Sequence, residues 1–304
     1  MSRPTVSLCV FAYNEEASIT ACLDAIAACA EEGDLTAHVM INGCTDRTEE
    51  VVRAYRPQGF RVVPVIIRLG DKANAWNTYT HEVAPAEAEF HVFTDGDMEM
   101  RPGSIAGFAE RFAAEPEAWG CAALPVTGRS RAAFRAQLLR ERWMAGNLYA
   151  LRGEALLAFR AKGVRLPRGV FGEDGLVTTL LKYSLDTRGA RNDARITATE
   201  RGGFAFRALS PWRLGDLRIY RNRRRRYALR QLQGEMLYPL LYEEGVGAMP
   251  EHVLDLYRAR FGRTRLAWRG LETIFAIEAR RRVARDLARA GEAVKAEDRA
   301  HLYS

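Results

Sequence analysis

Two carboxylates follow a short apolar run in the first third of the chain. Residues 90–93 read Phe-His-Val-Phe, which has the composition of a buried strand, and Asp95-Gly96-Asp97 come soon after it. The carboxyl edge of an open α/β sheet is where ligands bind. Carboxylates at that edge suit a divalent cation that also holds a phosphate group. All three residues of Asp95-Gly96-Asp97 also favour turns, so the tripeptide alone is equally compatible with a plain turn.

A second acidic pair, Glu173-Asp174, lies between Gly172 and Gly175 and precedes an apolar helical stretch over residues 176–183. Acidic residues at a helix start are common as caps and stabilise the positive end of the helix dipole. Taken alone, an acidic pair between two glycines at a helix start is compatible with a plain capping arrangement.

The elements that would position these residues alternate between strands and helices. Apolar runs predict strands over residues 5–12, 37–41, 61–68 and 90–93. Helical spacing predicts helices over residues 17–30 and 47–55, and a third that begins in residues 70–77. This alternation predicts a mainly parallel sheet with helices on its faces. The loops after the first three strands should then meet Asp95 and Asp97 at the carboxyl edge of the sheet.

The rest of the chain predicts additional elements and a second domain. Helices are expected from Gly103 through Ala114 and over residues 132–145 and 153–161. The other expected elements are a strand over 119–126, a short edge strand over 148–151 and an extended stretch over 195–206. From Arg213 onward the pattern is helical. We expect an α/β domain over residues 1–207 and a basic helical extension over residues 208–304.

Composition limits the class of protein. The 304 residues are 48% hydrophobic and carry a formal net charge of +7, which is typical of a globular protein with a sizeable core. No stretch approaches the roughly 18 uncharged apolar residues of a membrane span, so a cytoplasmic location is the expectation. Five cysteines without a CxxC pair predict reduced thiols and no zinc site.

The densest charged run is Arg221-Asn222-Arg223-Arg224-Arg225-Arg226. Such a run attracts phosphate groups on nucleic acid, on anionic lipid or on a phosphorylated small molecule. It is equally compatible with a solvated helical face. The run leaves a peripheral contact with an anionic membrane open.

Five motifs in order make the sequence resemble the family 2 glycosyltransferases, which have the Rossmann-like GT-A fold. The motifs occupy residues 11–16, 42–48, 71–77, 95–97 and 173–174, and the resemblance covers about the first two thirds of the chain. It implies that the protein moves a sugar from a nucleoside-diphosphate sugar to an acceptor hydroxyl. It also implies a mainly parallel central sheet flanked by helices.

The resemblance assigns roles to individual positions of the donor site. Asp95 would face the ribose, and Asp97 with Asp95 would bind Mg²⁺ or Mn²⁺. Lys72 would approach the diphosphate as a point charge. The positions that the resemblance implies for binding the donor are Phe11, Ala12, Tyr13, Asn14, Glu15, Asn42, Lys72, Asn74, Asp95 and Gly96.

The resemblance implies that Asp174 removes the proton from the acceptor hydroxyl, with Glu173 as an orienting neighbour, and that the anomeric configuration inverts. The Gln-x-x-Arg-Trp motif of processive synthases does not occur in the sequence, so a single addition per event is expected. Ile41 stands where many family members carry an aspartate that contacts uracil, so the nucleotide base stays open. Glycan, lipid-linked and small-molecule acceptors also stay open.

Two other readings compete with glycosyl transfer. A sugar nucleotidyltransferase can have the same kind of sheet and metal site. Such an enzyme usually has a glycine-rich loop after the first strand, whereas Tyr13-Asn14-Glu15-Glu16 contains no glycine. A non-catalytic module of the same fold would use its basic helices to bind anionic lipid or nucleic acid. The complete set of Asp95, Asp97, Glu173 and Asp174 argues against this second reading, and nucleic acid is not the expected partner.

Overall fold

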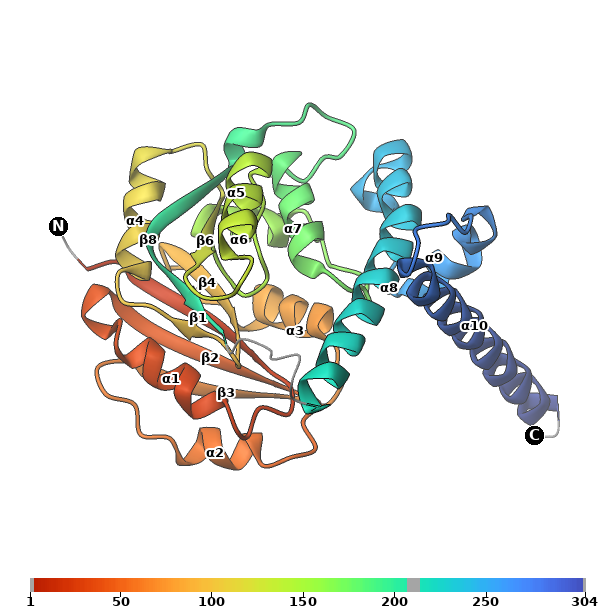
Figure 1. Cartoon of the computed structure of the whole chain (residues 1–304), viewed down its shortest axis with the longest axis horizontal. Helices are drawn as coiled ribbons and strands as arrows, with labels where there is room; N and C mark the ends of the chain where they lie inside the picture. Colours follow the sequence, from red (N-terminus) through yellow and green to blue (C-terminus); the bar gives the residue numbers. More distant parts are fainter. Residues whose placement is uncertain (1–2, 207–213, 303–304) are drawn as a thin grey trace. The chain divides into compact units, whose positions relative to one another are not determined.

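The computed structural model describes residues 3–206 and 214–302, which form two compact units (Figure 1). The first unit contains Met1–Leu166 and Gly172–Ala208, and the second contains Pro167–Phe171 and Leu209–Ser304. The domain boundary predicted at residues 207 and 208 lies outside the described residues. A five-residue segment of the second unit thus interrupts the first unit shortly before Glu173.

The first unit is built on an eight-stranded sheet with the strand order β3-β2-β1-β4-β7-β6-β8-β5. Strands β3, β2, β1 and β4 are adjacent and parallel, and β6 and β8 are also parallel to each other. Strand β7 is antiparallel to both of its neighbours, β4 and β6. The short strand β5 is antiparallel to β8. The strands are β1 (Thr5–Ala12), β2 (Asp34–Asn42), β3 (Arg61–Ile67), β4 (Phe90–Asp95), β5 (Glu99–Met100), β6 (Gly120–Pro125), β7 (Leu148–Arg152) and β8 (Ile196–Ala205).

The register of the parallel strands brings their carboxyl ends together. Phe11 lies opposite Asp95 across β1 and β4, Ala12 lies opposite Ile41 across β1 and β2, and Asn42 lies opposite Ile67 across β2 and β3. Because these strands are parallel, the loops that follow them leave the same edge of the sheet. The predicted gathering of these loops with Asp95 is confirmed.

Side chains of β1 alternate between two differently packed faces. Val6, Leu8 and Val10 lie in an apolar core with Leu23 of α1 and Phe108 of α4. The helices of the first unit, drawn around the sheet in Figure 1, are α1 (Ile19–Ala27), α2 (Thr48–Ala54), α3 (Lys72–Thr78), α4 (Ser104–Ala114), α5 (Arg131–Glu141), α6 (Gly153–Ala161) and α7 (Glu173–Lys182), with shorter turns η1 (Ala30–Glu32), η2 (Tyr79–Val83) and η3 (Asp193–Arg195).

The other face of the sheet is packed with aromatic rings. Phe93 of β4 stacks on Tyr149 of β7, with ring centroids 4.9 Å apart, and on Trp76 of α3 at 6.1 Å. Trp76 also meets the edge of Phe159 in α6 at 5.0 Å. These buried rings fix α3 against the sheet, and α3 is the helix that carries Lys72 at its first position.

The prediction of an edge strand over residues 148–151 is wrong. Strand β7 lies inside the sheet between β4 and β6 and pairs with both. Leu148, Tyr149, Ala150 and Leu151 are all buried, which is the pattern of an interior strand with both faces covered. The short apolar run itself predicts a strand. Which strands it pairs with depends on residues elsewhere in the chain and cannot be predicted from the run alone.

Some element boundaries also differ from the prediction. The helix expected over residues 132–145 ends at Glu141, because Arg142 adopts a left-handed backbone conformation with φ of 46°. Helix α7 begins at Glu173, three residues before the predicted apolar stretch, and every one of its residues is buried. Glu173 and Asp174 therefore belong to a helix of the core.

The second unit consists of helices and the inserted segment Pro167–Phe171. Arg168 donates its N–H to the carbonyl of Glu251 at 2.8 Å and accepts the N–H of Val253 at 3.0 Å. The helical elements are α8 (Leu214–Glu244), η4 (Val246–Ala248), α9 (Val253–Arg260), η5 (Phe261–Arg263) and α10 (Glu272–Leu302). None of the helices in the described parts of the chain is long and apolar enough to cross a membrane.

The arginine run of α8 is partly neutralised inside the second unit. Arg225 Nε lies 2.6 Å from a carboxylate oxygen of Glu278 in α10, and Arg221 Nη2 lies 3.3 Å from the other. Arg224 pairs with Glu272 at the start of α10. These ion pairs join α8 to α10, so much of this charge has a partner within the protein.

Candidate active site

The loops after β2 and β3 are joined at the carboxyl edge by hydrogen bonds and by a close approach of their backbones. Asn42 is 4% exposed, and its Oδ1 accepts the N–H of Asp71 at 3.0 Å. Gly43 donates its N–H to Ile67 at 2.7 Å and adopts φ of 67°. A Cβ atom at Gly43 would lie 2.5 Å from Gly70, so only glycine allows this close approach. These contacts give Asn42 a role in joining the loops, and its part in binding the donor stays a prediction.

The loop after β1 is tied to the loop after β2. Asn14 has a left-handed backbone with φ of 56°, and its Oδ1 accepts the N–H of Thr45 at 2.8 Å. Glu15 donates its N–H to Oγ1 of Thr48 at 2.8 Å. Tyr13 is 56% exposed, and its ring lies beside Gly70, where an added Cβ would be 3.1 Å from the ring. An accessible aromatic ring on an ordered loop can stack on a nucleotide base.

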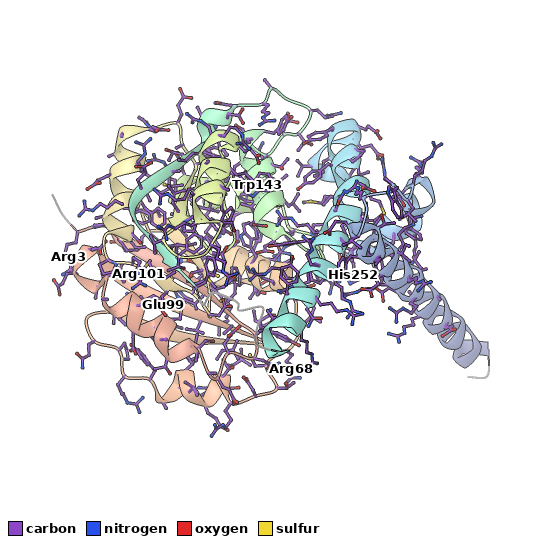
Figure 2. All side chains as sticks on the ribbon, viewed as in Figure 1. Arg3, Arg68, Glu99, Arg101, Trp143 and His252 are labelled. Carbon is purple, nitrogen blue, oxygen red and sulfur yellow. The ribbon has the colours of Figure 1, made fainter. Side chains whose placement is uncertain are left out.

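The Asp95-Gly96-Asp97 turn is attached to the end of β1. Gly96 donates its N–H to the carbonyl of Phe11 at 2.8 Å, and a Cβ at Gly96 would lie 3.0 Å from that carbonyl oxygen. Asp95 is half-buried and Asp97 is exposed. Glu99 and Arg101, which follow along the chain, pair with each other at 3.7 Å (Figure 2). Asp95 and Asp97 thus form the acidic pair of this turn.

Lys72 connects the two predicted acidic motifs. Its Nζ lies 2.5 Å from Oδ1 of Asp95 and 2.8 Å from Oε1 of Glu173. It also lies 5.0 Å from the centroid of the Phe11 ring. Asp71 caps α3 by accepting the N–H of Asn74 at 3.1 Å, which fixes the helix start from which Lys72 projects. The half-buried Asn74 therefore lies in the same turn as Lys72.

Glu173 and Asp174 occupy the first two positions of α7 and are 7% and 8% exposed. Oδ2 of Asp174 accepts a hydrogen bond from the N–H of Gly146 at 3.0 Å, and Oδ1 accepts one from the N–H of Gly175 at 2.8 Å. Gly172 begins the turn with φ of 81°. The helix start thus holds both carboxylates in a defined position next to Lys72.

Gly146 is a residue of this site that the sequence reasoning missed. A Cβ at Gly146 would lie 3.3 Å from Oε1 of Glu173 and 3.4 Å from Nζ of Lys72. The only local signal was a glycine between a helical pattern and an apolar run. Its contact with Asp174 depends on the pairing of β7 with β4, which the sequence did not predict.

The site contains more carboxyl groups than positively charged groups. Burial opposes the charge on Lys72, but the carboxylates of Asp95 and Glu173 raise its pKa above the usual range. The pKa of Asp95 is raised to about 6. Burial is the main cause and the negative charge of Asp97 adds to it, whereas the positive charge of Lys72 lowers the pKa. Burial also raises the pKa of Glu15 to about 7, with Ser18 opposing and Asp97 and Asp95 adding to the shift. One lysine therefore faces several carboxyl groups.

The described residues contain no group of three or more His, Cys, Asp or Glu side chains arranged as a complete metal site. Mg²⁺ and Mn²⁺ at phosphate-binding sites commonly take only one or two carboxylates and complete their shell with phosphate oxygens and water. Asp97 is exposed and lies close enough to Asp95 and Glu15 to raise the pKa of both. This excess of negative charge and the oxygen donors fit a divalent cation that is shared with a diphosphate.

The structure brings nearly all the predicted site residues to one edge of the first unit. Residues 11–15, Asn42, Lys72, Asn74, residues 95–97 and the pair 173–174 lie at the carboxyl ends of β1 to β4 or at the adjoining starts of α3 and α7. Ala12 is buried and accepts a hydrogen bond from the Cys44 thiol, so its side chain is part of the core.

The model of the family described as glycosyl transferase family 2 matches residues 7–162, just over half of the chain. The chain belongs to this family. Among solved structures, a mannosyltransferase from Pyrobaculum calidifontis, PcManGT in complex with GDP-Man and Mn²⁺, is similar over 100% of this chain and 82% of its own, with 21% identity and a TM-score of 0.60. This likeness shows that the family 2 glycosyltransferase has the GT-A fold.

Two other similar structures have lower scores. Glucosyl-3-phosphoglycerate synthase from Mycobacterium tuberculosis, in complex with Mn²⁺, UDP-glucose and phosphoglyceric acid, is 22% identical over 70% of this chain and 74% of its own, with a TM-score of 0.48. S. aureus TarS 1-349 is 16% identical over 94% of this chain and 92% of its own, with a TM-score of 0.47. No curated protein sequence matches the chain.

Proposed function

We propose that this family 2 glycosyltransferase transfers one sugar per event from a nucleoside-diphosphate sugar to an acceptor hydroxyl, with inversion at the anomeric carbon. The observation that carries the proposal is the position of Lys72 between Asp95 and Glu173. Lys72 brings the donor motif within a few ångströms of the acidic pair at the start of α7. A donor and an acceptor bound at these two motifs would meet at one point.

The donor half of the site uses the loops after β1, β3 and β4. The exposed ring of Tyr13 lies beside Gly70 and offers a surface for the base. Asp95 accepts hydrogen bonds from the ribose, and Lys72 supplies positive charge towards the diphosphate. PcManGT, which shares the fold, is in complex with GDP-Man and Mn²⁺, and this supports a diphosphate-sugar donor here.

Asp97, together with Asp95, would hold Mg²⁺ or Mn²⁺ against the diphosphate. When bound, the cation would neutralise the charge of the departing nucleoside diphosphate. Lys72 provides a fixed positive charge in the same region whether or not the cation is present.

Asp174 acts as the base of the proposed reaction. The acceptor hydroxyl oxygen forms a bond to the anomeric carbon while the bond from that carbon to the diphosphate oxygen breaks, and the hydroxyl proton passes to Asp174. The N–H groups of Gly146 and Gly175 hold the Asp174 carboxylate in place at 3.0 and 2.8 Å. Glu173, anchored by Lys72, orients the acceptor. Attack from the side opposite the leaving group inverts the anomeric configuration.

The first experiment is a thermal-shift panel of UDP, GDP, CDP and dTDP, each with Mn²⁺, with Mg²⁺ and with a chelator. A ligand that binds only the folded state stabilises it by about 2.7 kcal/mol at a hundredfold excess over its Kd. We expect metal-dependent stabilisation by one of the four nucleotides, which also identifies the donor. Absence of stabilisation by all four would contradict the proposed donor site.

The second experiment tests the base. Asp174→Asn keeps a similar shape but cannot take a proton, so we expect the transfer rate to fall by about 10²-fold or more while nucleotide affinity changes little. Asp34→Asn is the matched control, because Asp34 is exposed at the opposite, amino-terminal end of β2. An Asp174→Asn enzyme with the full transfer rate would refute the assignment.

A further inference from the structure

A cluster of exposed apolar side chains lies in the second unit, between η5 and the first turn of α10. Trp268 is 83% exposed, Leu271 81%, Ile274 55% and Leu266 48%. Single exposed apolar residues are common on protein surfaces. Four large ones within nine residues form a patch of the kind that marks a protein or membrane contact. We refer to residues 261–274 as the docking segment.

The docking segment has a defined conformation that displays these side chains. Arg269 donates its N–H to Oγ1 of Thr273 at 2.8 Å, and Thr273 donates its N–H to the carbonyl of Gly270 at 3.1 Å. Gly270 adopts φ of 60°, which completes the turn. The exposed residues are therefore presented by an ordered turn, and little conformational freedom would be lost on docking.

The beginning of the docking segment is held from α10. Arg280 donates to Oγ1 of Thr264 at 2.6 Å and to its carbonyl at 3.3 Å. The same guanidinium lies 4.8 Å from the centroid of the Phe261 ring. These contacts attach the beginning of the segment to α10.

Positive charge surrounds the exposed apolar residues. Arg263 and Arg265 are exposed, and neither forms an ion pair with another described residue. Arg281 and Arg285 are also exposed, and they follow Ile274 in α10 by seven and eleven residues, which places all three on one helix face. This contrasts with Arg221, Arg224 and Arg225, whose charges are paired with Glu272 and Glu278.

We propose that the docking segment binds the surface of an anionic lipid bilayer. Trp268, Leu271, Leu266 and Ile274 would enter the boundary between headgroups and acyl chains, where tryptophan is favoured. Arg263, Arg265, Arg281 and Arg285 would contact the lipid phosphates. This inference does not depend on the proposed sugar transfer.

The mixture of residues favours a bilayer over other occupants. A second copy of the chain packed symmetrically on this patch would bring like-charged arginines together, which disfavours such a dimer. Nucleic acid would be attracted by the arginines, but it gives no reason for two aliphatic side chains as exposed as Leu271 and Ile274. An anionic membrane satisfies both the apolar and the charged part of the patch.

The test is flotation of the full chain with vesicles of phosphatidylglycerol and phosphatidylcholine, and with vesicles of phosphatidylcholine alone. We expect flotation with the anionic vesicles that weakens as salt is raised. The variant Trp268→Ser/Leu271→Ser should lower the partition coefficient by about tenfold or more, because it removes apolar insertion. Arg263→Gln/Arg265→Gln should lower it severalfold on anionic vesicles. Leu157→Ser is the matched control, since Leu157 is 43% exposed in the first unit.

Tryptophan fluorescence gives a second measurement that does not depend on a disruptive variant. Anionic vesicles should shift the emission of the wild-type protein to shorter wavelength, and Trp268→Phe should abolish most of that shift. Absence of flotation with anionic vesicles, or a Trp268→Phe protein with the unchanged shift, would overturn the proposal. It would also be overturned by light scattering that shows a dimer lost in Trp268→Ser, without any vesicle binding.

Discussion

Lys72 is the residue at which the two acidic motifs of the first unit meet. Its ammonium group contacts carboxylates of Asp95 and Glu173, and Glu173 is 7% exposed. Removal of the lysine charge leaves a carboxylate buried without its cation, which is costly. The lysine is thus required both by the stability of the site and by its proposed chemistry.

Lys72→Met retains much of the apolar stem but not the charge. We expect a loss of about 2 kcal/mol in the free energy of unfolding, which is less than the roughly 3–5 kcal/mol for a fully buried pair because Lys72 is partly exposed. We also expect the transfer rate to fall by about tenfold or more, because Glu173 and Asp95 lose their common partner. Denaturant unfolding and single-turnover kinetics measure the two effects. Lys162 is exposed, and Lys162→Met serves as the control. Equal losses of stability and rate in both variants would contradict the proposed role of Lys72.

Gly146 offers a more local test of the same site. Alanine would place a methyl group 3.3 Å from Oε1 of Glu173 and 3.4 Å from Nζ of Lys72, a spacing that forces one of these groups to move. The added Cβ would also lie 3.4 Å from Cβ of Asp174, the proposed base, which accepts the N–H of Gly146 at 3.0 Å. Because a small displacement of the base can lower the rate strongly, we expect Gly146→Ala to reduce kcat by about tenfold with little change in nucleotide affinity. Gly247→Ala is the matched control, as nothing lies within 4 Å of its Cβ position. Equal kcat values for the two variants would show that the site tolerates the methyl group.

At the scale of elements, the sequence predicted β1 with its observed bounds, Thr5–Ala12, because its apolar run ends abruptly at polar loop residues. It also predicted that the loops after the parallel strands meet, since that follows from strand direction alone. The interior position of β7 and the two-residue strand β5 escaped prediction, because pairing partners depend on residues far away in the chain. Gly146 was missed for the same reason.

The inserted segment Pro167–Phe171 connects the helical unit to the residues before the proposed base. Gln233 of α8 is 1% exposed, accepts the N–H of Phe171 at 2.8 Å and donates to the carbonyl of Gly169 at 2.9 Å. Its Nε2 also lies 2.6 Å from the hydroxyl oxygen of Tyr257. Two residues after Phe171 the chain reaches Glu173. Gln233 thus fixes the inserted segment Pro167–Phe171 to α8 within the second unit.

Gln233→Leu preserves volume but removes all three hydrogen bonds. We expect the second unit to lose about 3 kcal/mol of unfolding free energy, at about 1 kcal/mol for each bond. We also expect kcat at saturating donor to fall, because the approach to Glu173 and Asp174 becomes less ordered. Gln231→Leu, on the exposed side of the same helix, controls for the loss of an amide. If kcat is unchanged while stability falls, Gln233 serves the helical unit alone.

At the scale of the whole molecule, the sheet that presents the site also buries a polar network on its aromatic face. Tyr79 donates to Oγ of Ser7 at 2.7 Å and lies 2.9 Å from Nδ1 of His91, while Nδ1 of His38 lies 3.1 Å from Oγ of Ser7. Burial lowers the pKa of His91 to about 3, and Arg160 and His38 add to this shift. Burial also lowers the pKa of His38. Both rings are therefore neutral in the folded protein at neutral pH.

These lowered pKa values give the stability of the first unit a defined pH dependence. Below about pH 6.5 the unfolded chain takes up protons at both histidines, whereas folded His91 stays neutral until about pH 3. The unfolding free energy therefore falls as pH decreases through this window, by up to about 1.4 kcal/mol per pH unit for each proton. His91→Gln cannot titrate, so its stability should fall less steeply than that of the wild type between about pH 6 and pH 4. Denaturant titrations at each pH measure the slope, and parallel curves for wild type and His91→Gln would mean that this network does not set the acid sensitivity of the fold.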